Sequence, residues 1–140
     1  MILSPAGSRA DDAPLTPLAE ADGRTGDLRL LLGNDVRAEA LAPLLARCRL
    51  IAIPFPGFAD GRGFSLAARL RDLGFDGVLR AVGSPIPDQM PMLRACGFDE
   101  VQIPDALAER QGREAWARAL AAARPPFRRR TARAGDAPRA

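Results

Sequence analysis

The sequence predicts an α/β fold: a small parallel sheet of about four strands with alternating helices, arranged as a half-barrel or as an open three-layer structure. Short apolar runs of strand length alternate along the chain with longer segments whose apolar residues recur at helical spacing. The pattern Gly-Phe-Asp-x-Val also occurs twice, at residues 74–78 and 97–101, after two consecutive helical segments. A glycine just after a helix takes the left-handed conformation. Repeated helix-to-strand junctions imply right-handed crossovers and a parallel sheet.

The chain divides into three parts. Residues 1–26 are rich in Pro, Gly, Ala, Ser and Asp and lack a sustained periodicity, so we expect them to be irregular. Residues 27–124 carry the periodic pattern and form the α/β domain. Residues 125–140 open with two prolines, are rich in arginine and cannot bury a core, which predicts a disordered Arg-rich tail. Both termini are therefore expected to be irregular.

The first half of the domain predicts two strands and two helices. Residues 28–32 form a short apolar run before a Gly-Asn-Asp turn, which is typical of a strand leading into a helix cap. Residues 38–47 carry leucines at helical spacing. Residues 50–55 are a continuous apolar run, as expected for a strand buried on both faces of a parallel sheet. A glycine-rich turn then leads to residues 64–73, whose leucines and alanine line one face of an amphipathic helix.

The second half predicts two more strands and two more helices. Residues 77–82 form a strand, and a loop punctuated by prolines follows it. Asp88 is suited to cap a helix that continues to residue 96. Residues 101–103 form a last short strand. Residues 114–124 form an alanine-rich helix that the two following prolines end.

The types of residue that are absent exclude several kinds of chemistry. The chain has no His, Lys or Tyr, so all 20 basic residues are arginines. Acid–base catalysis by imidazole, Ser-His or Cys-His pairs and His-ligated metals are therefore excluded. A lysine Schiff base and a Walker-type phosphate lysine are excluded as well. This composition favours a binding role over an enzyme that transfers protons near neutral pH.

Location and cofactors follow from the cysteines and from the motifs. Cys48 and Cys96 have no metal-ligand spacing, and no secretory signal precedes them, which fits the reducing cytoplasm. The longest apolar run is far shorter than the ~20 residues that cross a bilayer, so no membrane association is expected. We expect both cysteines to be small core residues. Flavin, haem and iron–sulfur motifs are absent, so no cofactor and no metal are expected.

The positive charge is concentrated at the carboxyl end of the chain. The net charge is +3, but the last seventeen residues hold six arginines and one aspartate. The rest of the chain is therefore slightly acidic. Because no aromatic residues are interleaved in the arginine run at residues 128–130, nucleic-acid binding is not expected. A domain of this size can leave a sheet edge for a partner to cover, so an oligomer is compatible with the sequence.

Polar residues follow the strands at the edge where parallel sheets bind ligands. The loop after the second predicted strand is the richest, because Asp60, Gly61 and Arg62 lie just before a helix whose first turn includes Ser65. Free backbone N–H groups, a hydroxyl and a guanidinium together could bind sulfate, sulfite or phosphate. The alternative is structural: Asp60 caps the turn and pairs with Arg62 or Arg80.

Arg80 interrupts an apolar strand. A buried arginine is costly unless it is paired or faces a ligand. We expect Asp60 or Asp88 to be its partner, and a salt bridge and a ligand contact are equally compatible with the sequence. Gln89 and Asp88 complete the candidate ligand-binding set, and Asp60 and Asp88 are the candidate catalytic acids or bases.

Several of these motifs resemble a bacterial family catalogued as domain of unknown function 934. The resemblance is carried by the apolar strand with Phe-x-Asp-Gly-Arg-x-Phe-Ser at residues 58–65, Arg-Ala-x-Gly at 80–83, Asp-Gln at 88–89 and Cys-Gly-Phe-Asp at 96–99. Members of the family are encoded beside sulfite reductase and carry the label of oxidoreductases involved in sulfite reduction. This chain departs from the family in the loop at residues 84–87, which lacks an acidic residue and an arginine.

The resemblance implies a role in assimilatory sulfate or sulfite reduction. Our leading hypothesis is a non-catalytic binding module that assists a sulfite-reductase system. In this hypothesis Arg62 and Arg80 recognise an oxyanion or a partner protein, positioned by Asp60 and Asp88, with Ser65 at the helix start. The partner would be sulfite reductase or another sulfate-assimilation protein. The alternatives are a small α/β enzyme that uses Asp60 or Asp88 with Arg62 as anion clamp, and a purely structural subunit.

Overall fold

The computed structural model describes residues 1–10, 13–33, 35–57 and 60–122, which form one seven-stranded sheet with helices. The spatial order of the strands is β2-β1-β7-β6-β5-β4-β3. The strands are β1 (Ile2–Ser4), β2 (Gly7–Arg9), β3 (Thr16–Pro17), β4 (Leu28–Leu31), β5 (Cys48–Phe55), β6 (Val78–Gly83) and β7 (Glu100–Gln102). The α-helices are α1 (Arg62–Asp72), α2 (Met90–Ala95), α3 (Asp105–Gln111) and α4 (Arg113–Ala122), and the 3-10 helices are η1 (Leu18–Gly23), η2 (Ala38–Arg47) and η3 (Pro87–Gln89). The predicted Arg-rich tail, residues 125–140, lies outside the described residues.

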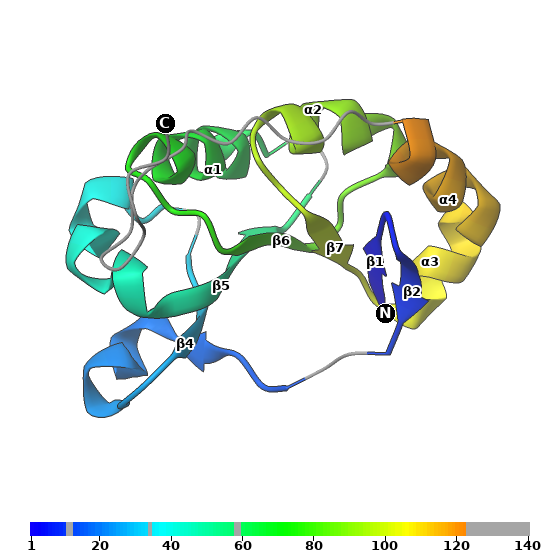
Figure 1. Ribbon diagram of the computed structural model, residues 1–140. Coiled ribbons are helices and arrows are strands. Elements are labelled where there is room, and N and C mark those ends of the chain that lie inside the picture. The colour runs from blue at the N-terminus through cyan, green and yellow to red at the C-terminus, as the bar shows by residue number, and fades with distance from the viewer. Residues whose placement is uncertain (11–12, 34, 58–59, 123–140) are drawn as a thin grey trace, which may run out of the picture.

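The strands from β3 to β7 follow each other in sequence and in space, and all neighbours among them are parallel. Sequential parallel strands with right-handed crossovers place their connecting helices on one face of the sheet. Figure 1 shows α1 and α2 on the same face of a curved sheet, with α3 and α4 beyond them at the β1–β2 end. The prediction of an α/β fold is therefore confirmed.

The number of strands in the sheet and their relative directions differ from the prediction. We expected about four strands, all parallel, and β4 to β7 correspond to these four. The structure adds β3 as a fifth parallel strand, and it adds β1 and β2, which pair antiparallel at the other edge. The prediction that the first 26 residues are irregular is wrong for these strands. They are only two or three residues long, too short for an alternating pattern to stand out in the sequence.

The short connection between β2 and β3 explains the curvature. These two strands lie at opposite edges of the sheet, six inter-strand gaps apart. At about 4.8 Å a gap, a flat sheet would separate them by about 29 Å. The chain from Arg9 to Thr16, even fully extended, reaches only about 25 Å. A flat sheet is therefore too wide for this connection, and the sheet has to curve to bring its two edges closer together.

The hydrophobic core lies between the sheet and the helices. Alternate residues of the central strands point toward α1 and α2 and are almost completely buried, for example Ile53 of β5 and Leu79 of β6. Phe55 packs edge-to-face against Phe64 of α1 and Phe98, with ring centroids 5.1 and 5.6 Å apart. These contacts join β5, α1 and the second Gly-Phe-Asp unit, which follows α2.

The repeated Gly-Phe-Asp pattern ends two helices as predicted. Gly74 and Gly97 take positive φ angles of 98° and 105°, and the N–H groups of the two following phenylalanines bond back to the helices. The repeat is longer than Gly-Phe-Asp-x-Val, because it begins with a Leu-Arg pair whose arginine stands four residues before each phenylalanine. In both units the guanidinium of this arginine donates to the carbonyl of the phenylalanine: Arg71 to Phe75 and Arg94 to Phe98.

Arg71 occupies the amino-terminal edge of the sheet, where it joins both copies of the repeat. Its Nη1 donates to the carbonyls of Phe75 and Gly77, at 2.9 and 2.8 Å. Its Nε and Nη2 donate to the carbonyl of Gly97, and Nη2 also donates to Asp99 at 2.9 Å. The guanidinium is buried and uses all five of its N–H groups in this way. Arg71 is therefore a structural residue that connects two loops far apart in the sequence.

The helices agree with the prediction less closely than the strands. The segment predicted as a helix at residues 38–47 is a 3-10 helix, η2, with Pro43 inside it. The α3 helix was not predicted, because seven residues are too few to show helical spacing. No helix among the described residues is long and apolar enough to span a membrane.

Candidate functional site

The predicted site residues at the start of α1 form a compact ion pair. Asp60 accepts hydrogen bonds from Nε and Nη2 of Arg62 at 3.1 and 2.7 Å, and also from the backbone N–H of Arg62 at 3.1 Å. Asp60 is mostly buried, with 16 % of its side chain exposed, whereas Arg62 is 61 % exposed. The hydrogen bond to Asp60, followed by the charge of Asp60, raises the pKa of Arg62 above its ordinary value. The structural alternative for Asp60, pairing with Arg62, is thus the arrangement found.

Packing explains the residues that flank this pair. Gly61 precedes the first turn of α1, which begins at Arg62, two residues earlier than predicted. A Cβ atom on Gly63 would lie 2.6 Å from the ring of Phe55, so only glycine fits beneath that ring. Phe64 packs against the same ring, and Ser65 is exposed on the outer side of the helix. The glycine and phenylalanine of the motif therefore hold the helix start on the sheet.

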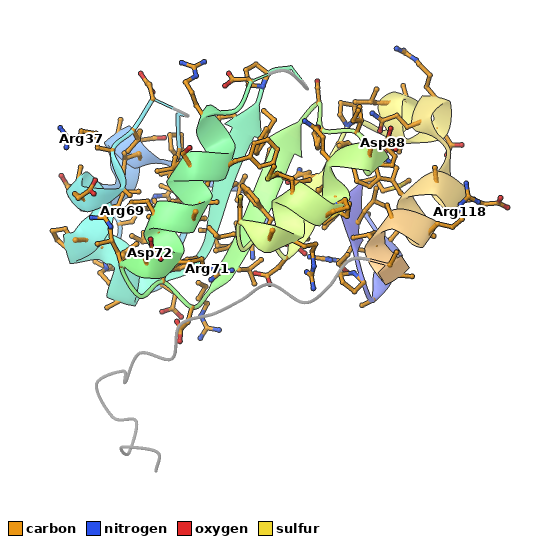
Figure 2. All side chains as sticks on the ribbon, turned by 90° about the horizontal axis from the view of Figure 1, so that it is seen from above. Arg37, Arg69, Arg71, Asp72, Asp88 and Arg118 are labelled. Atoms are coloured by element: carbon orange, nitrogen blue, oxygen red, sulfur yellow. The ribbon has the colours of Figure 1, made fainter. Side chains whose placement is uncertain are left out.

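Asp88 and Gln89 lie in η3, on the next loop along the same edge. Figure 2 shows Asp88 at the edge of the sheet opposite to Arg71 and Asp72, which lie where α1 ends. Asp88 is exposed. The Oε1 atom of Gln89 accepts a hydrogen bond from the backbone N–H of Ile86 at 3.0 Å. Gln89 was predicted to bind a ligand, and in the structure its side chain stabilises the loop in which it lies.

Arg80 does not join these residues, and its expected partner is corrected. It is the third residue of β6, within the strand rather than at its end, and it is 1 % exposed. The parallel register places Arg80 beside Glu100 of β7. Arg80 bonds to Glu100 through Nε and Nη2 at 2.9 and 2.8 Å, and its Nη1 donates to Gln102 at 3.0 Å. The pairing found is thus with β7 instead of with Asp60 or Asp88, because the register sets the neighbour of a strand residue.

The residues that complete this cross-strand network were not predicted from the sequence. Glu100 also accepts a hydrogen bond, 2.8 Å long, from Arg9 of β2. The alternation polar–apolar–polar in residues 100–102 was the available signal. It places Glu100 and Gln102 on the face opposite to the buried Val101. The contribution of Arg9 could not be found in the sequence, because β2 was not predicted.

Carboxylates and cations alternate along the carboxyl-terminal edge of the sheet. One aspartate follows each of β4, β5, β6 and β7 at this edge: Asp35, Asp60, Asp88 in η3, and Asp105 at the start of α3. The positive groups among them are Arg37, Arg62 and the amino group of Met1, which lies 3.0 Å from Asp105. We call these four aspartates and three cations the carboxyl rim. Because the rim holds both signs, it does not concentrate positive charge.

The cysteines lie away from the carboxyl rim. Cys48 begins β5 and is buried, and burial raises the pKa of its thiol to about 11. Burial also raises the pKa of Cys96, which is less enclosed. Both thiols are therefore poor nucleophiles at neutral pH. Among the described residues, no group of three or more His, Cys, Asp or Glu side chains could hold a metal ion.

The shifted pKa of Cys48 gives a prediction for its reactivity. In the single-thiol variant Cys96→Ser, the folded protein at pH 8 is expected to react with a thiol reagent at least about a hundredfold more slowly than the urea-unfolded protein. The reason is that a thiol pKa near 11, two units above the ordinary value of 9.0, leaves about a hundredth of the thiolate. Alkylation followed by mass spectrometry measures both rates, with Cys48→Ser as control for the reagent. Equal rates in the folded and unfolded protein would contradict the burial of this thiol.

The same shift has a consequence for stability. The neutral thiol is favoured in the folded state, so its contribution is fully present below pH 9. It is lost as the pH rises from 9 toward 11. The urea midpoint of the Cys96→Ser variant is therefore expected to fall more steeply across this window than that of Cys48→Ser.

The fold and the site define a class of protein: a small α/β protein with one curved sheet and polar loops gathered at the carboxyl ends of its parallel strands. The chain belongs to the family described as bacterial protein of unknown function (DUF934), whose model matches residues 29–133. This match confirms the family that the motifs indicated. It runs from the second residue of β4 through β7 and begins after β1, β2 and β3. No curated protein and no solved structure matches the chain.

Proposed function

We propose that this protein is a non-catalytic binding module of assimilatory sulfate or sulfite reduction, which acts in the cytoplasm by docking on a sulfite reductase or another protein of that pathway. The family resemblance supports the pathway, because members are encoded beside sulfite reductase. The geometry of Arg62 supports the binding role. The carboxyl rim is the docking surface in this proposal.

Arg62 is the observation that carries the proposed binding role. A guanidinium has two edges that can each form a pair of parallel hydrogen bonds. Asp60 occupies the edge made by Nε and Nη2. The described residues place no partner on Nη1, and the side chain is largely exposed. Because Asp60 already holds the side chain in place, a partner that binds the remaining edge loses little side-chain entropy. Arginines of this kind are enriched among the residues that dominate binding energy.

The charge of the rim favours a protein partner over a free oxyanion. A small dianion is attracted by a concentration of positive charge, whereas here the carboxylates outnumber the cations. Alternating charges are suited to a protein surface with the complementary pattern, where they set orientation and specificity. The rim is therefore better suited to recognise a protein than to bind sulfite.

The alternative function, a small enzyme, has less support. The oxygens of Asp60 accept hydrogen bonds from Arg62, so this carboxylate serves the ion pair and the helix start. Asp88 lies on a different loop and is exposed to solvent, where proton transfer to a substrate gains little from the protein. Binding therefore explains the positions of these residues better than catalysis.

Replacing Arg62 with alanine is expected to weaken binding to purified sulfite reductase by at least about tenfold, because an exposed anchor arginine contributes about 2 kcal/mol or more to an interface. Biolayer interferometry with the immobilised reductase measures the change. Arg69→Ala is the matched control, because Arg69 is a similarly exposed arginine of α1 that pairs with Glu39, away from the rim. Equal affinities of wild type and Arg62→Ala would remove Arg62 from the interface.

A growth experiment tests the pathway. Deletion of the gene is expected to slow growth when sulfate is the sulfur source and to leave growth on cysteine unchanged. Complementation with the wild-type gene should restore growth on sulfate, and complementation with Arg62→Ala should restore it less. Equal growth of the deletion strain on both sulfur sources would refute the proposed pathway.

A further inference from the structure

One peptide group of the rim loop between β6 and α2 is held by two glutamine side chains. The carbonyl of Pro85 accepts a hydrogen bond from Nε2 of Gln111 at 3.0 Å. The N–H of Ile86, on the other side of the same peptide bond, donates to Oε1 of Gln89 at 3.0 Å. The loop lies outside the strands, so these amides supply the hydrogen bonds that a sheet would otherwise provide. They set the conformation of the loop that presents Asp88.

Gln111 is itself held by Trp116. The indole Nε1 donates to Oε1 of Gln111 at 2.8 Å, and Trp116 is completely buried. An indole N–H can only donate and a carbonyl can only accept, so the amide of Gln111 has a single orientation that satisfies both neighbours. Its oxygen has to face Trp116, and its NH2 group has to face Pro85. Gln111 therefore connects a buried anchor to the rim loop.

The position of Gln111 in the chain suits this connection. It is the last residue of α3, and Gly112, with a φ of 89°, turns the chain into α4. The turn brings Trp116 of α4 back to Gln111, only five residues earlier. The loop residue Pro85 is 26 residues away in sequence. The side chain of Gln111 thus links the last two described helices to the rim loop.

We propose that Gln111 is a positioning residue for the carboxyl rim: it transmits the anchoring of Trp116 to the loop that carries Asp88, and it thereby keeps this part of the rim ready to bind the partner. The part of this inference that concerns partner binding rests on the proposed function of the carboxyl rim. Trp116 is the single tryptophan of the chain. Its indole N–H signal therefore reports on the loop through Gln111.

The variant Gln111→Glu isolates the bond to the loop. A glutamate keeps an oxygen that accepts from Trp116, but it has no N–H to donate to Pro85. We expect the backbone N–H of Ile86 to exchange with solvent at least about tenfold faster in this variant, because its peptide group is no longer held from the carbonyl side. Hydrogen exchange followed by NMR measures this rate. The exchange rate of Ile53, in the central strand β5, should remain unchanged, which distinguishes a local effect from a loss of the fold.

The control is Glu109→Gln, an exposed position of the same helix whose side chain pairs with Arg113. It is expected to leave both the Ile86 exchange rate and the Trp116 indole signal unchanged. The variant Trp116→Phe removes the indole N–H while keeping a large ring, and it should accelerate exchange at Ile86 as Gln111→Glu does. An unchanged Ile86 rate in both Gln111→Glu and Trp116→Phe would overturn the positioning role.

Binding to immobilised sulfite reductase then separates the inference from the proposed function. Gln111→Glu is expected to bind about tenfold more weakly than wild type, and Glu109→Gln is expected to bind equally well. If wild type binds and Gln111→Glu binds with the same affinity, the inference is overturned and the proposed function stands. If wild type does not bind, the proposed function is overturned, and with it the role of Gln111 in partner binding.

Discussion

Replacing Arg71 with methionine is expected to lower the free energy of unfolding by about 3–5 kcal/mol, as is typical when one partner of a buried ionic network is removed. The methionine would fill part of the space, but it cannot donate a hydrogen bond. The carbonyls of Phe75, Gly77 and Gly97 and the carboxylate of Asp99 would each lose a donor inside the protein. Buried acceptors without a donor account for much of the expected cost.

Urea denaturation of wild type and variant measures this difference. Arg69→Met is the matched control, because Arg69 lies two residues earlier on the same helix, is 52 % exposed and pairs with the exposed Glu39. An exposed ion pair contributes little, so this control should change the stability by less than about 1 kcal/mol. Similar losses in the two variants would mean that the backbone contacts of Arg71 do not stabilise the protein.

Replacing Gly83 with alanine is expected to destabilise the protein by about 3 kcal/mol. Gly83 ends β6 with a φ of 122°, a conformation that side chains strongly disfavour. A Cβ atom would also lie 2.5 Å from the carbonyl oxygen of Phe55. The backbone cannot simply move away, because the N–H of Ser84 donates to the same oxygen at 2.8 Å. The substitution therefore combines backbone strain with a steric clash.

Thermal and urea unfolding of Gly83→Ala measure the effect. Gly57→Ala is the control, because no atom of the described residues lies within 4 Å of an added Cβ there. The control is expected to be neutral or slightly stabilising, since alanine reduces the conformational freedom of the unfolded chain. A loss below about 1 kcal/mol in Gly83→Ala would show that the end of β6 relaxes around the side chain.

Arg71 and Gly83 lie at opposite edges of the sheet, and the two edges have different roles. Arg71 lies at the amino-terminal edge, where its hydrogen bonds go to backbone carbonyls and hold consecutive units together. Gly83 lies at the carboxyl-terminal edge, where it allows β6 to end against β5 and lead into the loop of Asp88. In open α/β sheets ligands bind at the carboxyl ends of the strands. The substitution of Arg71 should therefore act through stability, whereas that of Arg62 should act through binding.

The candidate site was predictable to the extent that it is local in sequence. Asp60 and Arg62 are two residues apart, so the sequence alone could predict their ion pair as the structural alternative to an anion-binding site. Arg80 could be recognised as unusual, because an arginine interrupts an apolar strand. Its partner Glu100 could not be identified, since the choice depends on the register between β6 and β7. Gln111 has no motif at all, and its role depends on the fold that brings α3 and α4 beside the rim loop.

The sequence by itself determined the α/β class, the four central strands and the family. Each of these depends on patterns within a few residues: apolar runs, helical spacing, and a glycine that ends a helix. Only the tertiary structure decided the rest. Three short strands join the sheet because neighbours provide their hydrogen bonds, and the curvature follows from a connection too short for a flat sheet. The partners of Arg71, Arg80 and Gln111 come from distant segments, because strand register and chain crossovers decide which side chains meet.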